Sequence, residues 1–334
     1  MRISLRGPLG WALAAGLVAA ACGGTQTSGQ PSAAASTGPR IGSFSRPVVL
    51  AFTPSQEGAI IASSGNAIKT ALERATGLSW KVTPMTSYAA EIEAICAGSV
   101  DAGFFAPLQM TLLLSRQCGS PILAALRKDD TGQLAPTYKS QILVRVDSGI
   151  NTLAELKGKK FAYPDVLSAS GYIFPTLIIK NKTGQEPKTF FSEMFPAGGH
   201  PQAALALYNR QVDAAATFID ARDSLVSTYP DIKTVTKVIE TAGPIPNDGV
   251  ALRKGFPDDV AKQVKSALLD YIKTDDGKKI FANPAFFQWD GMQEVDAKFY
   301  DPMAEAAKLA GVDVEKLVQN TPRPAATPSP AKTP

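Results

Sequence analysis

The sequence predicts an α/β protein of two lobes, joined by two crossing strands that act as a hinge, with the ligand in the cleft between the lobes. Three observations predict this fold class. Short β-rich runs alternate with helical segments over residues 47–320, which is typical of sheets covered by helices. The segment 158–239 repeats the composition of the first half. Strands expected near 141–146 and 249–252 flank that segment and can cross between the lobes.

Lobe 1 is expected to comprise residues 47–142 and 245–320. Gly77 and Gly98 follow helical segments, and glycine is the residue that most often ends a helix. The stretch from 258 to about 319 is expected to be mostly helical. The other elements expected in this lobe are a strand at 47–52, a helix at 65–76, a strand at 80–84, a helix at 88–97 and a strand at 100–105.

Lobe 2 is expected to comprise residues 143–244. Gly158 follows a short helical segment, and Pro164 follows a strand and opens a turn. The elements expected here are a short helix at 152–156, a strand at 161–163, a helix at 171–181, a strand at 189–191, a helix at 201–209 and strands at 214–218 and 234–240.

Residues 1–21 are expected to be a lipoprotein signal peptide. Arg2 and Arg6 precede an apolar run that ends in small residues, the usual order of an export signal. The residues around Cys22 resemble a bacterial lipobox, in which the cysteine is lipidated and becomes the new N-terminus. Ala19 stands where that pattern usually has Leu. The alternative is an ordinary secretory signal with an unmodified Cys22.

Two terminal segments are expected to lie outside the folded body. Residues 22–46 are rich in Gly, Ser, Thr, Ala and Pro without an apolar period, which predicts a flexible tether. Residues 321–334 contain repeated prolines and are expected to be disordered. We therefore expect the protein to be exported and held at the extracytoplasmic face of the cell membrane by its lipid anchor only.

Composition excludes several functional classes. The formal net charge is +4, or +2 once Arg2 and Arg6 are removed, which argues against nucleic-acid binding. One histidine and three cysteines are too few for a His- or Cys-rich metal site, so we expect no metal and no cofactor. Cys96 closes one helical stretch and Cys118 follows another, so the two would form a disulfide in an oxidising compartment; the alternative is two buried free thiols.

Four segments carry candidate binding groups. Ser168 and Ser170 precede a helix, where hydroxyls and free backbone N–H groups favour an anion, although such serines are often only helix caps. His200 follows two glycines and could donate to an anionic oxygen with a charge that follows pH, or be an ordinary packed residue. Asp220 ends a strand, and Asp248 precedes the return strand, where an Asx-turn is the alternative.

These motifs contain no nucleophile elbow and no nucleotide-binding fingerprint, so we expect no enzyme activity. Together they resemble the phosphate/phosphite/phosphonate-binding proteins of ABC importers, the PhnD-like family, over most of residues 47–320. The strongest parts are "AAEIEAICAGSVDAGFFAP" after Tyr88, "YPDVLSASGYIFP", "GGHPQAALALYNRQVDAAATFIDA" and "GPIPNDGVALRK". The resemblance implies a type II-like periplasmic-binding-protein fold.

The resemblance also implies a set of ligand contacts. Tyr88 and Tyr138 would offer phenol hydroxyls, and Ser168 and Ser170 would bind oxygens together with backbone amides at 169–171. His200 would donate to another oxygen, while Asp220 and Asp248 would accept a ligand proton or hold a cationic substituent. Two positions depart from the family pattern: Ala169 lies where a middle Thr is common, and Asp220 where a longer Glu can occur.

We therefore expect a monomeric receptor that captures a small phosphorus oxyanion and delivers it to an ABC permease. Dipoles and hydroxyls are expected to hold the anion without a buried Lys or Arg. Phe105 or Phe218 could form an apolar wall, or belong to the core. The alternatives are a receptor of the same fold for another small anion, such as a sulfonate or a vitamin precursor, and a sensory binding protein.

Overall fold

The computed structural model describes residues 38–129 and 131–320, and the described residues from Pro39 onward form one compact unit. The expected signal peptide at 1–21, the lipidation of Cys22, most of the tether and the tail at 321–334 lie outside the described residues. No helix within the described ranges is long and apolar enough to span a membrane.

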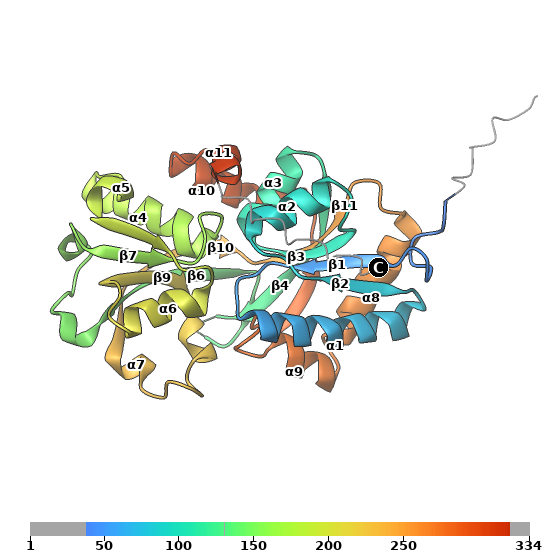
Figure 1. The fold of residues 1–334 in the computed structure, drawn as a ribbon, viewed down its shortest axis with the longest axis horizontal. Helices are drawn as coiled ribbons and strands as arrows, with labels where there is room; N and C mark the ends of the chain where they lie inside the picture. The colour runs from blue at the N-terminus through green and yellow to red at the C-terminus, as the bar shows by residue number, and fades with distance from the viewer. Residues whose placement is uncertain (1–37, 130, 321–334) are drawn as a thin grey trace, which may run out of the picture. The chain divides into compact units, whose positions relative to one another are not determined.

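Two separate sheets confirm the expected α/β class (Figure 1). The first has the strand order β12-β4-β11-β3-β1-β2, with β5 attached to β4. Strands β1, β2 and β3 run parallel, whereas β11 and β12 are antiparallel to their neighbours. Its strands are β1 (Val48–Phe52), β2 (Trp80–Thr83), β3 (Ala102–Phe105), β4 (Gly119–Lys128), β5 (Leu134–Ala135), β11 (Gly249–Arg253) and β12 (Gly291–Glu294).

Helices cover both faces of this sheet because its strands are apolar on both sides. Leu50 and Phe52 point into a core shared with α1, α8 and α9, while Ala51 points into a second core with α2, α3 and α10. The helices are α1 (Gly58–Thr76), α2 (Tyr88–Cys96), α3 (Pro107–Ser115), α8 (Asp258–Tyr271), α9 (Asp275–Phe281), α10 (Asp301–Leu309) and α11 (Val314–Asn320), with a 3₁₀ turn η5 (Ala297–Tyr300).

The second sheet has the order β10-β6-β9-β7-β8. Helix α4 packs on one face and α6 on the other. Its strands are β6 (Thr137–Arg145), β7 (Lys160–Tyr163), β8 (Glu193–Pro196), β9 (Ala214–Phe218) and β10 (Thr236–Pro246). Its helices are α4 (Phe174–Thr183), α5 (Pro187–Phe190), α6 (His200–Tyr208) and α7 (Ile232–Val235), with the π-helical turn η3 (Ala169–Ile173) before α4 and the 3₁₀ turns η1 (Val146–Ser148), η2 (Ala154–Leu156) and η4 (Ala221–Ser224).

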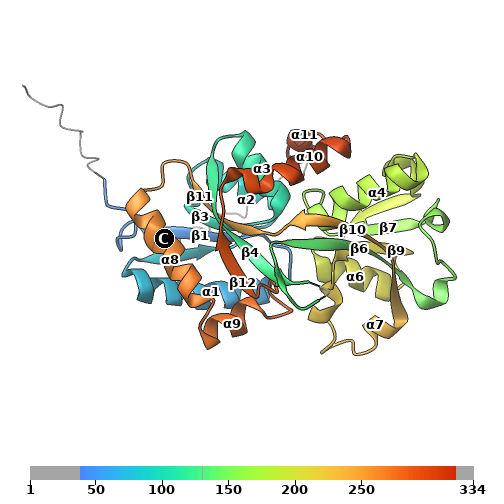
Figure 2. The same ribbon diagram turned by 180° about the vertical axis from the view of Figure 1, so that it is seen from behind.

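The chain passes between the sheets twice, as Figure 2 shows from behind. The first passage, from β5 to β6, falls at Pro136, earlier than the expected boundary after 142, because all of β6 pairs in the second sheet. The second, from β10 to β11, falls at residues 247–248, close to the expected position. Residue Lys180 of α4 also donates to the Ala310 carbonyl after α10, at 2.9 Å.

Four local expectations were wrong. Helix α1 begins at Gly58 rather than at 65. The segment expected as a strand at 189–191 ends helix α5, which begins at Pro187, a favourable first helical residue. Strand β12 interrupts the stretch expected to be helical because it pairs with β4. The end of the expected tether, residues 40–46, forms a turn whose Ile41 is buried in the core.

Candidate functional site

A cavity lies between residues of the two sheets, with about 440 Å³ of space that includes part of its opening to solvent. Both lobes line it, as expected of a two-lobed receptor. The residues from the first are Thr53, Ser55, Gln56, Tyr88, Phe104, Phe105, Ala106, Arg127, Asp248, Phe287 and Trp289. Those from the second are Tyr138, Ser168, Ala169, His200 and Phe218.

The cavity collects helix N-termini from both lobes. The lining residues Tyr88, Ala169 and His200 each occupy the first position of a helix, α2, η3 and α6. Ala106 is the N-cap residue of α3. Carboxyl ends of parallel strands and the helix starts that follow them meet at one sheet edge. Their unpaired N–H groups and dipoles make the cavity favourable for an anion.

Arg127, at the end of β4, brings a buried cation to this cavity. Its Nη2 lies 2.8 Å from Asp248 Oδ2, and its guanidinium stacks on the rings of Tyr138 at 4.9 Å and Phe218 at 5.1 Å. Nε and Nη1 are buried and have no hydrogen-bond partner among the described residues. The expectation of a site without a buried Lys or Arg was therefore wrong. Arg127 was not predicted because it lies in β4, and no strand was expected at residues 119–128.

Asp248 lies where the resemblance implied, beside the cavity and just before β11. Burial raises the pKa of this carboxyl, and the charge of Arg127 opposes that shift. Burial, reinforced by the charge of Asp248, also raises the pKa of the Tyr138 phenol. Burial likewise raises the pKa of Tyr88, with the charges of Asp165 and Asp248 adding to the effect. Both phenols therefore keep their protons and can donate to an anion.

The serine segment only partly faces the cavity. Ser168 and Ala169 line it, and the Ser168 Oγ accepts the Gly171 N–H at 3.0 Å, as a helix cap does. Ser170 is buried outside the lining residues, and its carbonyl accepts the Ser140 hydroxyl at 2.6 Å. A side chain at Gly171 would place its Cβ 2.2 Å from the Pro164 ring, so only glycine fits this turn.

His200 lies in the cavity as an uncharged ring. Its Nε2 is 3.5 Å from Ser168 Oγ, Nδ1 is buried without a partner among the described residues, and its ring packs edge-on to Phe218. Burial, assisted by the charge of Arg127, lowers the pKa of His200 to about 3. The ring is therefore uncharged at neutral pH, and its charge can change only in acid. Its backbone N–H donates to the Ser55 carbonyl at 3.0 Å, which links the two lobes.

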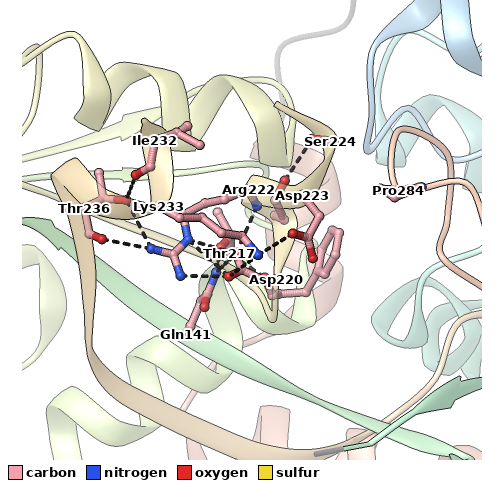
Figure 3. A network of polar contacts seen from close by, with 12 residues as sticks. Gln141, Thr217, Asp220, Arg222, Asp223, Ser224, Ile232, Lys233, Thr236 and Pro284 are labelled. Carbon is pink, nitrogen blue, oxygen red and sulfur yellow. Dashed lines mark hydrogen bonds and ion pairs between the residues drawn. The ribbon is translucent and has the colours of Figure 1, made fainter. Parts of the chain in front are cut away.

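Asp220 does not line the cavity. Figure 3 shows its carboxylate turned to Arg222, whose Nη2 and Nε donate at 2.7 and 2.9 Å, with Gln141 donating at 3.1 Å. Lys233 lies 3.5 Å away. Burial opposes ionisation, but the hydrogen bonds and charge of Arg222 lower the pKa of Asp220 to about 2. Asp220 was assigned to the ligand from the sequence, but Arg222, two residues later, is its partner in the structure.

Aromatic rings form one wall of the cavity. Phe105 and Phe218, suggested from the sequence as wall or core, are both: they line the cavity and are almost fully buried. Phe104, Phe287 and Trp289, which the sequence analysis did not name, stack on one another in the same wall. Phe287 and Trp289 follow α9 in a stretch expected to be helical, so no motif marked them.

A disulfide lies in the first lobe, away from the cavity. Cys96, at the end of α2, and Cys118, just before β4, are joined by a disulfide with their Cα atoms 4.8 Å apart. They lie outside the cavity lining. The described residues contain no cluster of three His, Cys, Asp or Glu that could hold a metal ion.

Comparison with known proteins agrees with this geometry. Residues 50–300 match the family model described as "ABC transporter, phosphonate, periplasmic substrate-binding protein". The chain is 30% identical over 224 residues to the "Phosphate-import protein PhnD" of Mycolicibacterium smegmatis, covering 65% of this chain and 66% of that one. It is 26% identical to the "Phosphonates-binding periplasmic protein" of Escherichia coli, covering 63% and 61%. The matches thus span slightly less than two thirds of these relatives.

Solved structures show the same fold. The binding-protein component of a phosphonate ABC transporter from Pseudomonas aeruginosa superimposes with a TM-score of 0.71 at 23% identity, covering 79% of this chain and 86% of that one. PhnD1 of Prochlorococcus marinus, solved with methylphosphonate, gives a TM-score of 0.68 at 18% identity, covering 78% and 97%. With a family model matched over most of the folded body, the chain belongs to the family of periplasmic phosphonate-binding proteins of ABC transporters.

Proposed function

We propose that this protein is the extracytoplasmic receptor of an ABC importer and captures a small phosphorus oxyanion of the phosphate, phosphite or phosphonate class. The observation that carries the proposal is the buried guanidinium of Arg127, whose Nε and Nη1 have no described hydrogen-bond partner in a cavity surrounded by helix N-termini. These two nitrogens lie on opposite edges of the guanidinium, so a bound anion would accept a charge-assisted hydrogen bond from one of them and be attracted by the charge of the whole group.

The remaining groups suit the other ligand atoms. Tyr88, Tyr138 and Ser168 can donate hydroxyl protons, and neutral His200 can donate from one ring nitrogen. Asp248 is an acceptor, so it favours an oxyanion that still carries a proton over sulfate, which carries none. The aromatic wall can face a P–H or P–C substituent. The site therefore combines recognition of charge with recognition of a proton.

Lobe closure would couple binding to delivery. Arg127 belongs to the first sheet, but it stacks between Tyr138 and Phe218 of the second. The Ser55 carbonyl of the first lobe accepts the His200 N–H of the second. A ligand held by Arg127 and His200 at once would stabilise this arrangement, and the permease could recognise it.

We also propose, as the sequence suggested, that the receptor is a lipid-anchored monomer without enzyme activity. Lipidation of Cys22 would anchor the protein, which acts as a monomer. The tether, about residues 22–39, lets the lobes reach the permease. The protein catalyses no reaction, so the ligand would leave it unchanged. A Cys22→Ala variant should be released from membranes, whereas the parent should partition with them and carry the lipid mass on its N-terminal peptide.

Calorimetric titration of ligand-stripped protein, residues 38–320, tests the ligand class directly. The panel is phosphate, phosphite, methylphosphonate, 2-aminoethylphosphonate, sulfate and taurine. We expect micromolar or tighter binding, about −8 kcal/mol or better, to at least one phosphorus ligand and none to sulfate. Silence with all four phosphorus ligands, or tighter binding of taurine, would overturn the proposal.

A further inference from the structure

A buried carboxyl lies directly behind the anion cavity and belongs to no ligand contact described above. It is Glu91, in the first turn of α2, and its side chain is fully buried. Its Oε2 lies 2.7 Å from the Thr53 hydroxyl and 3.0 Å from the Gln109 amide nitrogen, while Oε1 has no hydrogen-bond partner among the described residues. No described ion pair involves Glu91, so the carboxyl lacks a compensating cation.

Two backbone groups set the orientation of the Gln109 amide, because one can only donate a hydrogen bond and the other can only accept one. The Ala106 backbone N–H can only donate, and it lies 2.8 Å from Gln109 Oε1. The Tyr88 carbonyl can only accept, and it lies 3.0 Å from Gln109 Nε2. Gln109 Oε1 is therefore an acceptor toward every neighbour, and Nε2 is a donor.

Counting protons around the Thr53 hydroxyl then determines the state of Glu91. Thr53 Oγ1 lies 2.6 Å from Gln109 Oε1, 2.9 Å from the Phe104 carbonyl and 2.7 Å from Glu91 Oε2. The first two are acceptors, and Thr53 has a single proton to donate. An ionised Glu91 would be a third acceptor competing for that proton. A protonated Glu91 donates to Thr53, whose own proton remains for Gln109 or Phe104.

We propose that Glu91 is a positioning residue that works as an uncharged acid, holding together the three segments of the first lobe that line the anion cavity. Through Thr53 it holds the loop between β1 and α1, and through Gln109 it holds the Tyr88 carbonyl at the start of α2 and the Ala106 N–H at the start of α3. Ionisation of Glu91 releases this junction and weakens anion binding. The proposal rests on the proposed function.

Among the described residues, no cation faces Glu91 to balance a negative charge there. The groups that face it are Thr53 from the loop after β1, Gln109 from α3 and Gly103 from β3, where a Cβ would lie 3.3 Å from Oε1. All three are uncharged. The tyrosines of the core around α2 and α3 are Tyr88 and Tyr300, which are fully buried, and Tyr138 and Tyr172, which are partly buried; burial raises the pKa of all four.

Burial likewise raises the pKa of Glu91 to about 8, with the hydrogen bonds of Thr53 and Gln109 opposing the shift. The acid is thus neutral at pH 7 and ionises as the pH rises above that value. If only the neutral form is competent, about one molecule in eleven can bind at pH 9, and the apparent Kd rises about tenfold.

The test compares the parent with Glu91→Gln by calorimetry between pH 6 and pH 9.5, using inorganic phosphate and methylphosphonate as probes. The glutamine stays uncharged, although its amide cannot both donate and accept at one atom as the acid does, so we expect a modest and constant loss of affinity. The ratio of the two Kd values removes the titration of the ligand itself. We expect that ratio to change about tenfold between pH 7 and pH 9, in favour of the variant.

Glu93→Gln is the matched control, because Glu93 lies on the same helix with an exposed side chain that pairs with Arg116. It should keep the pH profile of the parent. A Kd ratio for Glu91→Gln that stays constant across this pH range would overturn the proposal while leaving the proposed function intact.

A measurement on the parent protein without ligand tests the inference about Glu91 separately from the proposed function, and it does not depend on whether a variant folds. Carbon-13 NMR of the parent labelled at glutamate side chains should show one carboxyl that is protonated at pH 7 and titrates near pH 8. If no phosphorus ligand binds but this signal appears, the proposed function fails and the uncharged acid stands. If every glutamate carboxyl is ionised at pH 7, the inference about Glu91 is wrong.

Discussion

Replacing Arg127 by Met removes the guanidinium from the cavity while keeping an unbranched side chain of similar length. In the parent, Nε and Nη1 have no described protein partner, so a bound anion can receive a hydrogen bond from one of these charged donors. Such bonds contribute about 1.5–3 kcal/mol each. Loss of this bond should cost about 1.5–3 kcal/mol, which corresponds to roughly a ten- to hundredfold increase in Kd. Calorimetry with phosphate and methylphosphonate measures it.

Two controls isolate the ligand contact from damage to the fold. Lys128→Gln changes the next residue of β4, whose side chain is largely exposed, and should leave Kd unchanged. Arg127→Met alone also leaves Asp248 buried without its partner, which should lower the unfolding free energy by about 3–5 kcal/mol. Combining it with Asp248→Asn should recover part of that stability in urea unfolding but none of the affinity. An Arg127→Met protein that is folded and binds within threefold of the parent would refute the assignment of the guanidinium.

Three further predictions concern the other charged and covalent features. His200→Ala should weaken binding at least about tenfold, or 1.4 kcal/mol; since the pKa of His200 is about 3, the parent should show no histidine step in Kd between pH 5 and pH 8. Asp220→Asn should leave Kd nearly unchanged. In the parent, ionised Asp220 contributes stability that is complete above the ordinary carboxyl pKa of 3.8 and is lost as the pH falls through about 2, so the variant should be less stable than the parent at pH 7, and by a smaller margin at pH 3, in urea unfolding. Reduction of Cys96–Cys118, which closes a 22-residue loop, should lower the unfolding free energy by about 3 kcal/mol and leave Kd unchanged.

The sequence by itself determined the fold class and most of the local elements. Helix ends at Gly77 and strand β9 at Ala214–Phe218 came out as expected, because apolar periodicity and glycine at a helix end act over a few residues. The family resemblance also implied that Tyr88, Ser168 and Asp248 contact one ligand, and all three line one cavity. Each of them lies next to the end of a helix or strand.

Only the tertiary structure decided which charges meet. Arg127 and Asp248 are 121 residues apart and pair because β4 and β11 are neighbours in the sheet, which no local pattern records. Asp220 has the position of a ligand residue but pairs with Arg222, because a side chain of its own lobe reaches it first. The neutral states of His200 and Glu91 likewise depend on how completely other elements exclude water from them. Burial and long-range pairing are properties of the packed chain, and they decided the chemistry of the site.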